Sequence, residues 1–274
     1  MKLKTVLFLG LAATSAWSCK TDETGNDDPL FGMETSPYIV APYKRLMKEV
    51  EMVNGVVVNE KTYNYSDKKL TSISTTDNSF SESISYTGDL INKIVKKENS
   101  IGNIITTTSN FVYNSADVVT KLDLTQSIND GTTVTNYVGT TDFVYTNAKL
   151  TKATTNFKKL SNGIFTPTLS IVTEWTYQNG DVIESTKTTH DYIANLTGTV
   201  TTTLSNYDSK KSLYNALPFQ YNFYSQVNEG LSTHNPRVVT DPSGTTNYSY
   251  GYDADSPLSR SNGNRTTQFQ YTVF

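Results

Sequence analysis

Few side chains in this sequence have the chemistry that catalysis requires. The chain contains two histidines, His190 and His234, and one cysteine, Cys19. His190 and Asp191 are neighbours in a stretch typical of a strand, where adjacent side chains point to opposite faces, so we expect a surface or half-buried histidine and not a general base. His234 stands two residues before Pro236, and we expect it to be an exposed turn residue. With Cys19 lipidated, as argued below, no Cys–His dyad is available.

Carboxylates remain the other candidates, because a pair that hydrolyses glycosides needs no local sequence signature. Three acidic residues qualify: Glu174, Glu184 and Asp191. Glu174 and Glu184 flank Asn179-Gly180 and face each other across the hairpin that this turn predicts, which ordinary cross-strand pairing also explains. The chain lacks a glycine-rich phosphate loop, a nucleophile elbow and a metalloprotease motif. We therefore predict no enzymatic activity and no cofactor, with a carboxylate-dependent, glycan-directed extracellular hydrolase as the alternative.

Metal and nucleic-acid binding are also disfavoured. A single cysteine excludes a disulfide framework and a cysteine-ligated zinc site. Asp253-Ala254-Asp255 has two carboxylates but lacks the further ligands of a calcium loop, so a polar turn is the better interpretation. The net charge of −3 and the pI near 5.5 are unlike those of nucleic-acid-binding proteins. We predict no metal site and no nucleic-acid partner.

Tyrosine is the abundant side chain with binding potential, at 18 residues. Five tyrosines recur at equivalent places, each two residues after an apolar or aromatic residue and just before a polar turn: Tyr65, Tyr86, Tyr113, Tyr145 and Tyr177. Recurrence favours a packed ladder in the core over a surface that stacks on sugar rings. Tyr214, Tyr221 and Tyr224 lie outside this rhythm and are the predicted ligand-binding residues.

The elements that must position these residues are strands. Aromatic residues make up 11% of the chain and charged residues 18%, and threonine is frequent, a composition that suits pleated surfaces. Pairs that tolerate positive φ, such as Asn54-Gly55, Asn162-Gly163 and Asn179-Gly180, separate alternating stretches and predict hairpins. We expect an all-β antiparallel meander of roughly 12–14 strands, curled into a barrel-like or strongly coiled sheet. Residues 206–213 read as a turn, and a short helix near 217–227 is expected to pack through Phe219, Phe223 and Val227.

The first residues predict export and a lipid anchor. Lys2 and Lys4 precede an apolar run at 5–13, which is too short to span a bilayer and fits a signal peptide at 1–18. Cys19 stands where such a signal is cut, so we predict that it is lipidated, with cleavage by an ordinary signal peptidase after Ala16 as the alternative. Residues 19–36 would form a flexible tether and residues 37–274 a single β-meander domain. Loss of the two lysines changes the net charge from −3 to −5.

Several segments resemble a family of secreted Bacteroidetes-type lipoproteins with a domain of unknown function of porin-like fold. The segments are 62–73, 84–94, 234–240 and 250–257. A weaker resemblance to tyrosine-aspartate (Rhs-like) repeats rests on Tyr207-Asp208 and Tyr252-Asp253. The first resemblance implies an all-β, barrel-like, extracytoplasmic lipoprotein and assigns no catalytic residue. It does not imply a pore, because threonine-rich strands such as 106–108 and 201–203 lack the alternating apolar band of a membrane barrel.

These observations predict a lipoprotein of the outer membrane, anchored through Cys19 and facing the cell exterior. Its domain would be a non-catalytic binding or scaffold module with a polysaccharide or protein ligand. Besides the hydrolase, a purely structural envelope protein is the remaining alternative.

Overall fold

The computed structural model describes residues 44–100, 102–161 and 163–273. They form one sheet of 17 strands and three short helices. The first strands are β1 (Lys44–Val53), β2 (Val56–Ser66), β3 (Lys69–Thr75), β4 (Phe80–Thr87), β5 (Leu90–Ser100), β6 (Asn103–Tyr113), β7 (Val119–Asn129), β8 (Val134–Thr146), β9 (Lys149–Ser161), β10 (Ile164–Gln178), β11 (Asp181–Asp191) and β12 (Leu196–Lys211). Then follow the 3-10 helix η1 (Leu213–Ala216), the helix α1 (Phe219–Ser225), the 3-10 helix η2 (Asn228–Leu231), β13 (His234–Asp241), β14 (Gly244–Asn247), β15 (Ser249–Asp253), β16 (Ser256–Asn262) and β17 (Arg265–Val273).

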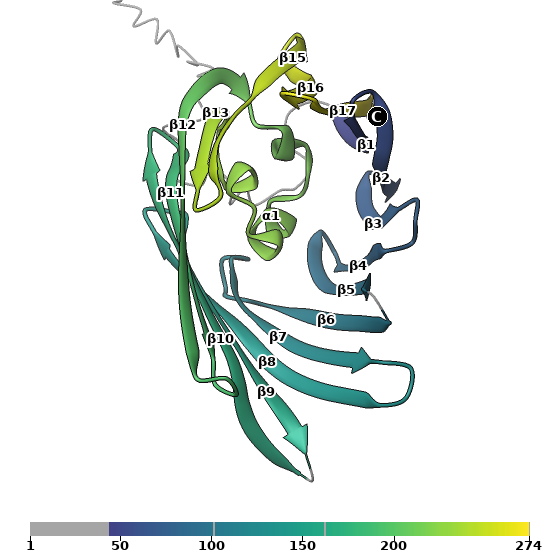
Figure 1. Ribbon diagram of the computed structural model, residues 1–274, viewed down its shortest axis with the longest axis vertical. Helices are drawn as coiled ribbons and strands as arrows, with labels where there is room; N and C mark the ends of the chain where they lie inside the picture. The colour runs from purple at the N-terminus through teal and green to yellow at the C-terminus, as the bar shows by residue number, and fades with distance from the viewer. Residues whose placement is uncertain (1–43, 101, 162, 274) are drawn as a thin grey trace, which may run out of the picture.

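The sheet curls into a nearly closed barrel (Figure 1). Successive strands pair antiparallel from β1 to β14 and from β15 to β17, and β17 pairs with β1. β15 follows β14 after the single residue Tyr248, whose backbone N–H still donates to Arg237 of β13 at 2.7 Å. The predicted antiparallel, barrel-like meander is therefore confirmed. The structure has 17 strands, more than the 12–14 expected. The last five, β13 to β17, are only four to nine residues long, so more strands fit into this part of the chain than the longer hairpins predicted.

The hairpins depend on residues that accept positive φ. Asn179 and Gly180 join β10 to β11 with φ of 51° and 88°, as their types predict. Asn147 and Ala148 join β8 to β9 with φ of 50° and 61°, although alanine is an unusual residue for this conformation. The β8–β9 turn is therefore not marked by an Asn-Gly or Asp-Gly pair in the sequence.

Residues 213–231, comprising η1, α1 and η2, form a plug inside the barrel (Figure 1). The helix expected near 217–227 is confirmed as the shorter α1, in which Phe219 and Phe223 are buried as predicted, whereas Val227 lies beyond its end and is only partly buried. The prediction of a turn over 206–213 was wrong, because β12 continues to Lys211. There β12 pairs with β13, which supplies the backbone partners that keep it extended.

The hydrophobic core lies between the plug and the inner wall. One cluster joins Phe219, Phe223 and Leu231 of the plug to residues of β7 to β12, and a second joins Leu213 and Leu217 to β1 to β5 and β17. Phe111 and Tyr224 pack against both clusters. Apolar side chains thus fill the contact between the plug and the wall.

The outward faces of β4 and β7 are polar. On β4, Ser81, Ser83 and Ser85 alternate with the buried Glu82 and Ile84 and therefore lie on the opposite, outward face. β7 likewise alternates buried Leu122 and Leu124 with exposed Asp123 and Thr125. Within the described ranges, no helix has the length and apolar character needed to cross a membrane.

Candidate functional site

The predicted tyrosine ladder is confirmed and ties neighbouring hairpins together. The hydroxyls of the five predicted tyrosines each donate to a backbone carbonyl of the preceding strand: Tyr65 to Leu46 (3.0 Å), Tyr86 to Leu70 (2.9 Å), Tyr113 to Ile91 (2.5 Å), Tyr145 to Val119 (2.7 Å) and Tyr177 to Leu150 (2.8 Å). Tyr207, which is not one of the five predicted tyrosines, makes the same contact with Val182. The ladder therefore serves the framework of the barrel.

A register shift accompanies each predicted ladder tyrosine. The shift falls immediately before Tyr65, Tyr86, Tyr113, Tyr145 and Tyr177 in the pairing with the next strand. Such bulges bend a strand and re-aim the side chains beside them. Burial raises the pKa of the Tyr65, Tyr113, Tyr145 and Tyr177 phenols, so their hydroxyls stay protonated donors.

The three predicted ligand-binding tyrosines belong to the plug. All three are half-buried and pack against the core cluster of β1 to β5. The hydroxyls of Tyr221 and Tyr224 donate to the two carboxylate oxygens of Glu82 at 2.7 and 3.1 Å. Tyr214 instead has its backbone carbonyl contacted by Asn222 Nδ2 at 3.1 Å. The role of these tyrosines in ligand binding stays a prediction, while their packing joins the plug to the barrel wall.

Glu82 is the buried carboxylate at the centre of this contact, with 4% of its surface exposed. Burial raises the pKa of its carboxyl, opposed by the two tyrosine hydroxyls and by the charges of Lys96 and Lys61. Burial also raises the pKa values of Tyr221 and Tyr224 well above the usual range, and the Glu82 charge adds to this. No sequence pattern points to Glu82, because its partners lie 139 and 142 residues away.

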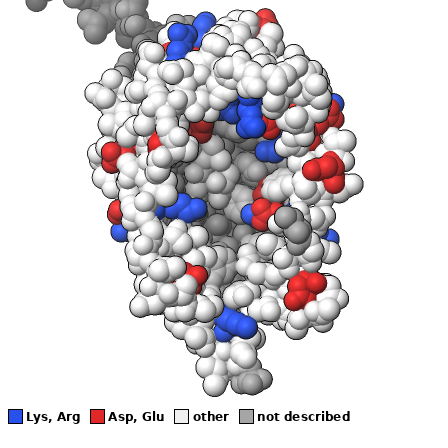
Figure 2. Space-filling model, in the orientation of Figure 1, with Lys and Arg blue, Asp and Glu red and all other residues white. Residues whose placement is uncertain are grey.

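The barrel interior is partly open beside the plug. Figure 2 shows this face hollowed at its centre, with Lys, Arg, Asp and Glu around the rim. Directly paired residues share a face, which places the row Thr107, Gln126 and Tyr137 on the inner wall of β6, β7 and β8. Thr107 is buried and accepts a hydrogen bond from Gln126 Nε2 at 3.0 Å. Tyr137 is half-buried.

A second inner row is shaped by Gly139 on β8, which pairs with Phe157 on β9. A Cβ at Gly139 would lie 2.9 Å from Cδ1 of Phe157 and would overlap the backbone oxygen of Asn156. Phe157 therefore lies against the glycine backbone. Two residues along each strand from this pair, Thr141 of β8 and Thr155 of β9 share a buried hydrogen bond of 2.8 Å. The inner wall of β6 to β9 thus combines aromatic faces with hydroxyl and amide groups.

The carboxylates considered for catalysis do not meet in a cleft. Glu174 is exposed and forms an ion pair with Lys152 at 3.0 Å. Its direct partner across the hairpin is Thr186, so Glu174 and Glu184 are diagonal neighbours on the outer wall rather than opposite residues. Asp191 accepts hydrogen bonds from the backbone of Ile193 and Ala194 and so stabilises the β11–β12 turn.

The two histidines are both structural. Nδ1 of His190 lies 2.7 Å from Oγ1 of Thr197, and its ring packs edge-on against Tyr192. His234 is not the exposed turn residue expected, because it opens β13 and is partly buried. Its Nδ1 lies 2.9 Å from Oδ2 of Asp181, and its backbone N–H donates to Oδ1 of the same residue at 2.8 Å.

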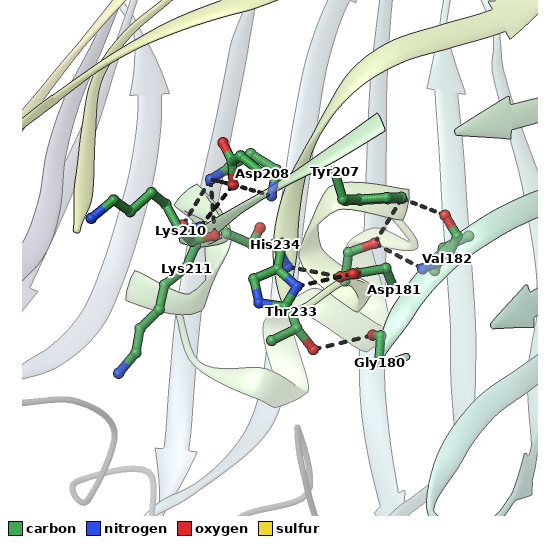
Figure 3. A network of polar contacts seen from close by, with 12 residues as sticks. Gly180, Asp181, Val182, Tyr207, Asp208, Lys210, Lys211, Thr233 and His234 are labelled. Atoms are coloured by element: carbon green, nitrogen blue, oxygen red, sulfur yellow. Dashed lines mark hydrogen bonds and ion pairs between the residues drawn. The ribbon is translucent and has the colours of Figure 1, made fainter. Parts of the chain in front are cut away.

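Figure 3 shows how the parts of the chain before and after the plug are fixed to the β10–β11 turn and the start of β11. Thr233 donates to the Gly180 carbonyl at 3.2 Å, His234 contacts Asp181, and Tyr207 donates to Val182. In the described part of the chain, no group of three or more His, Cys, Asp or Glu side chains could hold a metal ion. Asp253 and Asp255 instead pair with Lys44 and Lys210, at 2.8 and 2.7 Å.

A pocket at the rim of the barrel was not anticipated from the sequence. It has a volume of about 240 Å³ and lies between the start of β1, the end of β17, the β15–β16 turn and the entrance to the plug. Its lining includes Lys44, Arg45, Lys211 and Tyr271. The sequence could not have indicated it, since these residues come from the two ends of the domain and from its middle.

Comparison with known proteins supports the fold. No protein-family model matches the sequence, and no curated protein matches it. Among solved structures, a porin-like protein from Bacteroides vulgatus superposes with a TM-score of 0.53 at 12% identity, covering 84% of this chain and 99% of the other. A porin-like protein from Bacteroides uniformis gives a TM-score of 0.41 at 16% identity, over 88% of this chain and all of the other. The porin-like barrel that the sequence resemblance implied is therefore present. Cys19, the signal peptide and the tether lie outside the described residues.

Proposed function

We propose that the protein is a lipoprotein of the outer membrane whose barrel is a non-catalytic glycan-binding module at the cell surface. The observation that carries the proposal is the hollow inside a barrel whose strands β4 and β7 present polar residues outward. A barrel inserted in lipid presents an apolar band on alternate outward residues, whereas the outward residues of β4 and β7 are serine, threonine, lysine and aspartate. This favours a domain that stands in water on a lipid tether.

The side chains of the inner wall support a sugar as the ligand. Tyr137 and Phe157 offer aromatic faces, and Gln126 and Thr107 offer an amide and a hydroxyl beside them. Aromatic rings bury the apolar face of a pyranose at low entropic cost, and neighbouring polar groups hydrogen-bond its hydroxyls. The tyrosine ladder holds this wall rigid, which lowers the entropy that binding has to overcome.

The test is a glycan-array and polysaccharide pull-down screen with soluble protein from Lys20 to Phe274. We expect saturable binding that Tyr137→Ala weakens at least about tenfold, as the loss of an aromatic platform predicts. Tyr192→Ala is the matched control, because Tyr192 is 48% exposed but lies at the β11–β12 turn. Silence across the screen, or equal losses in both variants, would refute the proposed site. Crosslinking on intact cells would then examine a protein partner.

A further inference from the structure

Two residues that line the rim pocket of about 240 Å³ carry buried donors that the protein itself does not satisfy. Arg45 Nε and the Tyr271 hydroxyl are both buried and have no hydrogen-bond partner, and both residues line this pocket. Leaving a buried polar group unpaired costs about 1–3 kcal/mol, so such groups are rare in native structures unless something else occupies the site. Their coincidence in one cavity indicates a missing acceptor.

The charges around the pocket point to the sign of that acceptor. Lys44 and Lys210 already have carboxylate partners, Asp253 and Asp255. Arg45 and Lys211 form no ion pair with any residue that the structure describes. Arg45 therefore has no counter-charge among the described residues, while Lys211 acts at longer range on the carboxylate of Asp255, which also lines the pocket.

The behaviour of Asp255 is consistent with a local excess of positive charge. The pKa of its carboxyl lies below the usual value, first because Lys210 donates to it and further because of the charges of Lys211 and Lys44. These lysines come from the entrance to the plug and from β1, so the positive field is produced only in the folded barrel.

We infer that this pocket binds the oxyanion group of a small molecule, a carboxylate or a phosphate. An arginine guanidinium, a lysine ammonium and a phenol hydroxyl are all donors, and an arginine fork matches the geometry of either oxyanion. The volume is below the 300–1,000 Å³ of pockets for drug-sized ligands, so the ligand is of monosaccharide or amino-acid size. Tyr137 is not among the residues that line this pocket. The inference about the pocket is therefore independent of the proposed glycan binding beside Tyr137.

Titration calorimetry tests this inference with the protein from Lys20 to Phe274 and three probes: glucuronate, inorganic phosphate and the neutral control glucose. We expect saturable binding of at least one anion and none of glucose at this site. Arg45→Gln should weaken binding at least about tenfold, the effect of a lost charged hydrogen bond, and Tyr271→Phe several-fold. Comparison of the two anions separates a carboxylate ligand from a phosphate ligand.

Lys158→Gln is the control for net charge, because Lys158 is exposed on β9 and is not a lining residue. Lys211→Gln removes an exposed lining charge and keeps the test valid if Arg45→Gln impairs folding, which thermal unfolding would reveal. The inference is wrong if neither anion binds, or if binding is as strong in Lys211→Gln and Tyr271→Phe as in Lys158→Gln.

Discussion

Replacing Tyr221 and Tyr224 together by phenylalanine tests whether the plug is held to the wall through a buried charge. The double variant keeps both rings in the core but removes the two hydroxyls that donate to Glu82 at 2.7 and 3.1 Å. A hydrogen bond to a charged group contributes about 1.5–3 kcal/mol, so two of them predict a loss of about 3–6 kcal/mol at a pH where Glu82 is ionised. With Glu82 protonated, the two bonds are neutral and the loss falls to about 2 kcal/mol.

The pH dependence follows from the direction of the Glu82 pKa. Burial raises that pKa in the folded state, so the folded protein binds a proton more readily than the unfolded chain. Stability from this group is therefore fully present below the unfolded value, about 4.3, and is lost as pH rises toward the folded pKa. Because the hydroxyls oppose the upward shift, the double variant should have a still higher pKa. Between the folded-state Glu82 pKa of the wild type and that of the variant, the difference in their free energies of unfolding can grow by up to about 1.4 kcal/mol per pH unit.

The assay is urea unfolding of the wild type and the variant at pH 7 and at pH 4.5, compared as differences so that other carboxyls cancel. Tyr145→Phe is the matched control, since its hydroxyl donates to the neutral carbonyl of Val119 at 2.7 Å. That variant should lose about 1–3 kcal/mol at both pH values. An equal loss in the double variant at both pH values would refute a charged carboxylate between plug and wall.

Three further predictions address the wall, a turn and the anchor. Gly139→Ala should cost about 1–3 kcal/mol in urea unfolding, because its Cβ would overlap the backbone oxygen of Asn156; a neutral result would contradict this packing. Asp130 should titrate near pH 2 in an NMR titration, since hydrogen bonds from the Thr132 hydroxyl and the backbone of Thr133 and Thr132 lower its pKa to about 2; a value near 4 would show that the turn is not formed. Labelling with a palmitate analogue should disappear in Cys19→Ala, and unchanged label would exclude lipidation at this residue.

Some functional residues could be found from the sequence and others could not. The ladder tyrosines were predicted because their spacing from each hairpin turn is local and recurs along the chain. Glu82 and the Asp181–His234 pair were not, because their partners are 53 to 142 residues away and no periodicity relates them. The rim pocket requires Arg45, Lys211 and Tyr271 at once: closure of β17 on β1 brings Arg45 near Tyr271, and the end of β12 adds Lys211.

The sequence by itself determined the all-β class of the fold and the antiparallel pairing of successive strands. Alternation of apolar and polar residues, with turn pairs such as Asn179-Gly180, specifies antiparallel hairpins, and Phe219 and Phe223 specify a short amphipathic helix. These are local properties of the backbone and of side chains a few residues apart. Only the tertiary structure decided that the helix lies inside the barrel, because this depends on which inner-wall residues meet it. Glu82 receives the tyrosine hydroxyls of the plug, and burial of the carboxylate at this contact raises its pKa.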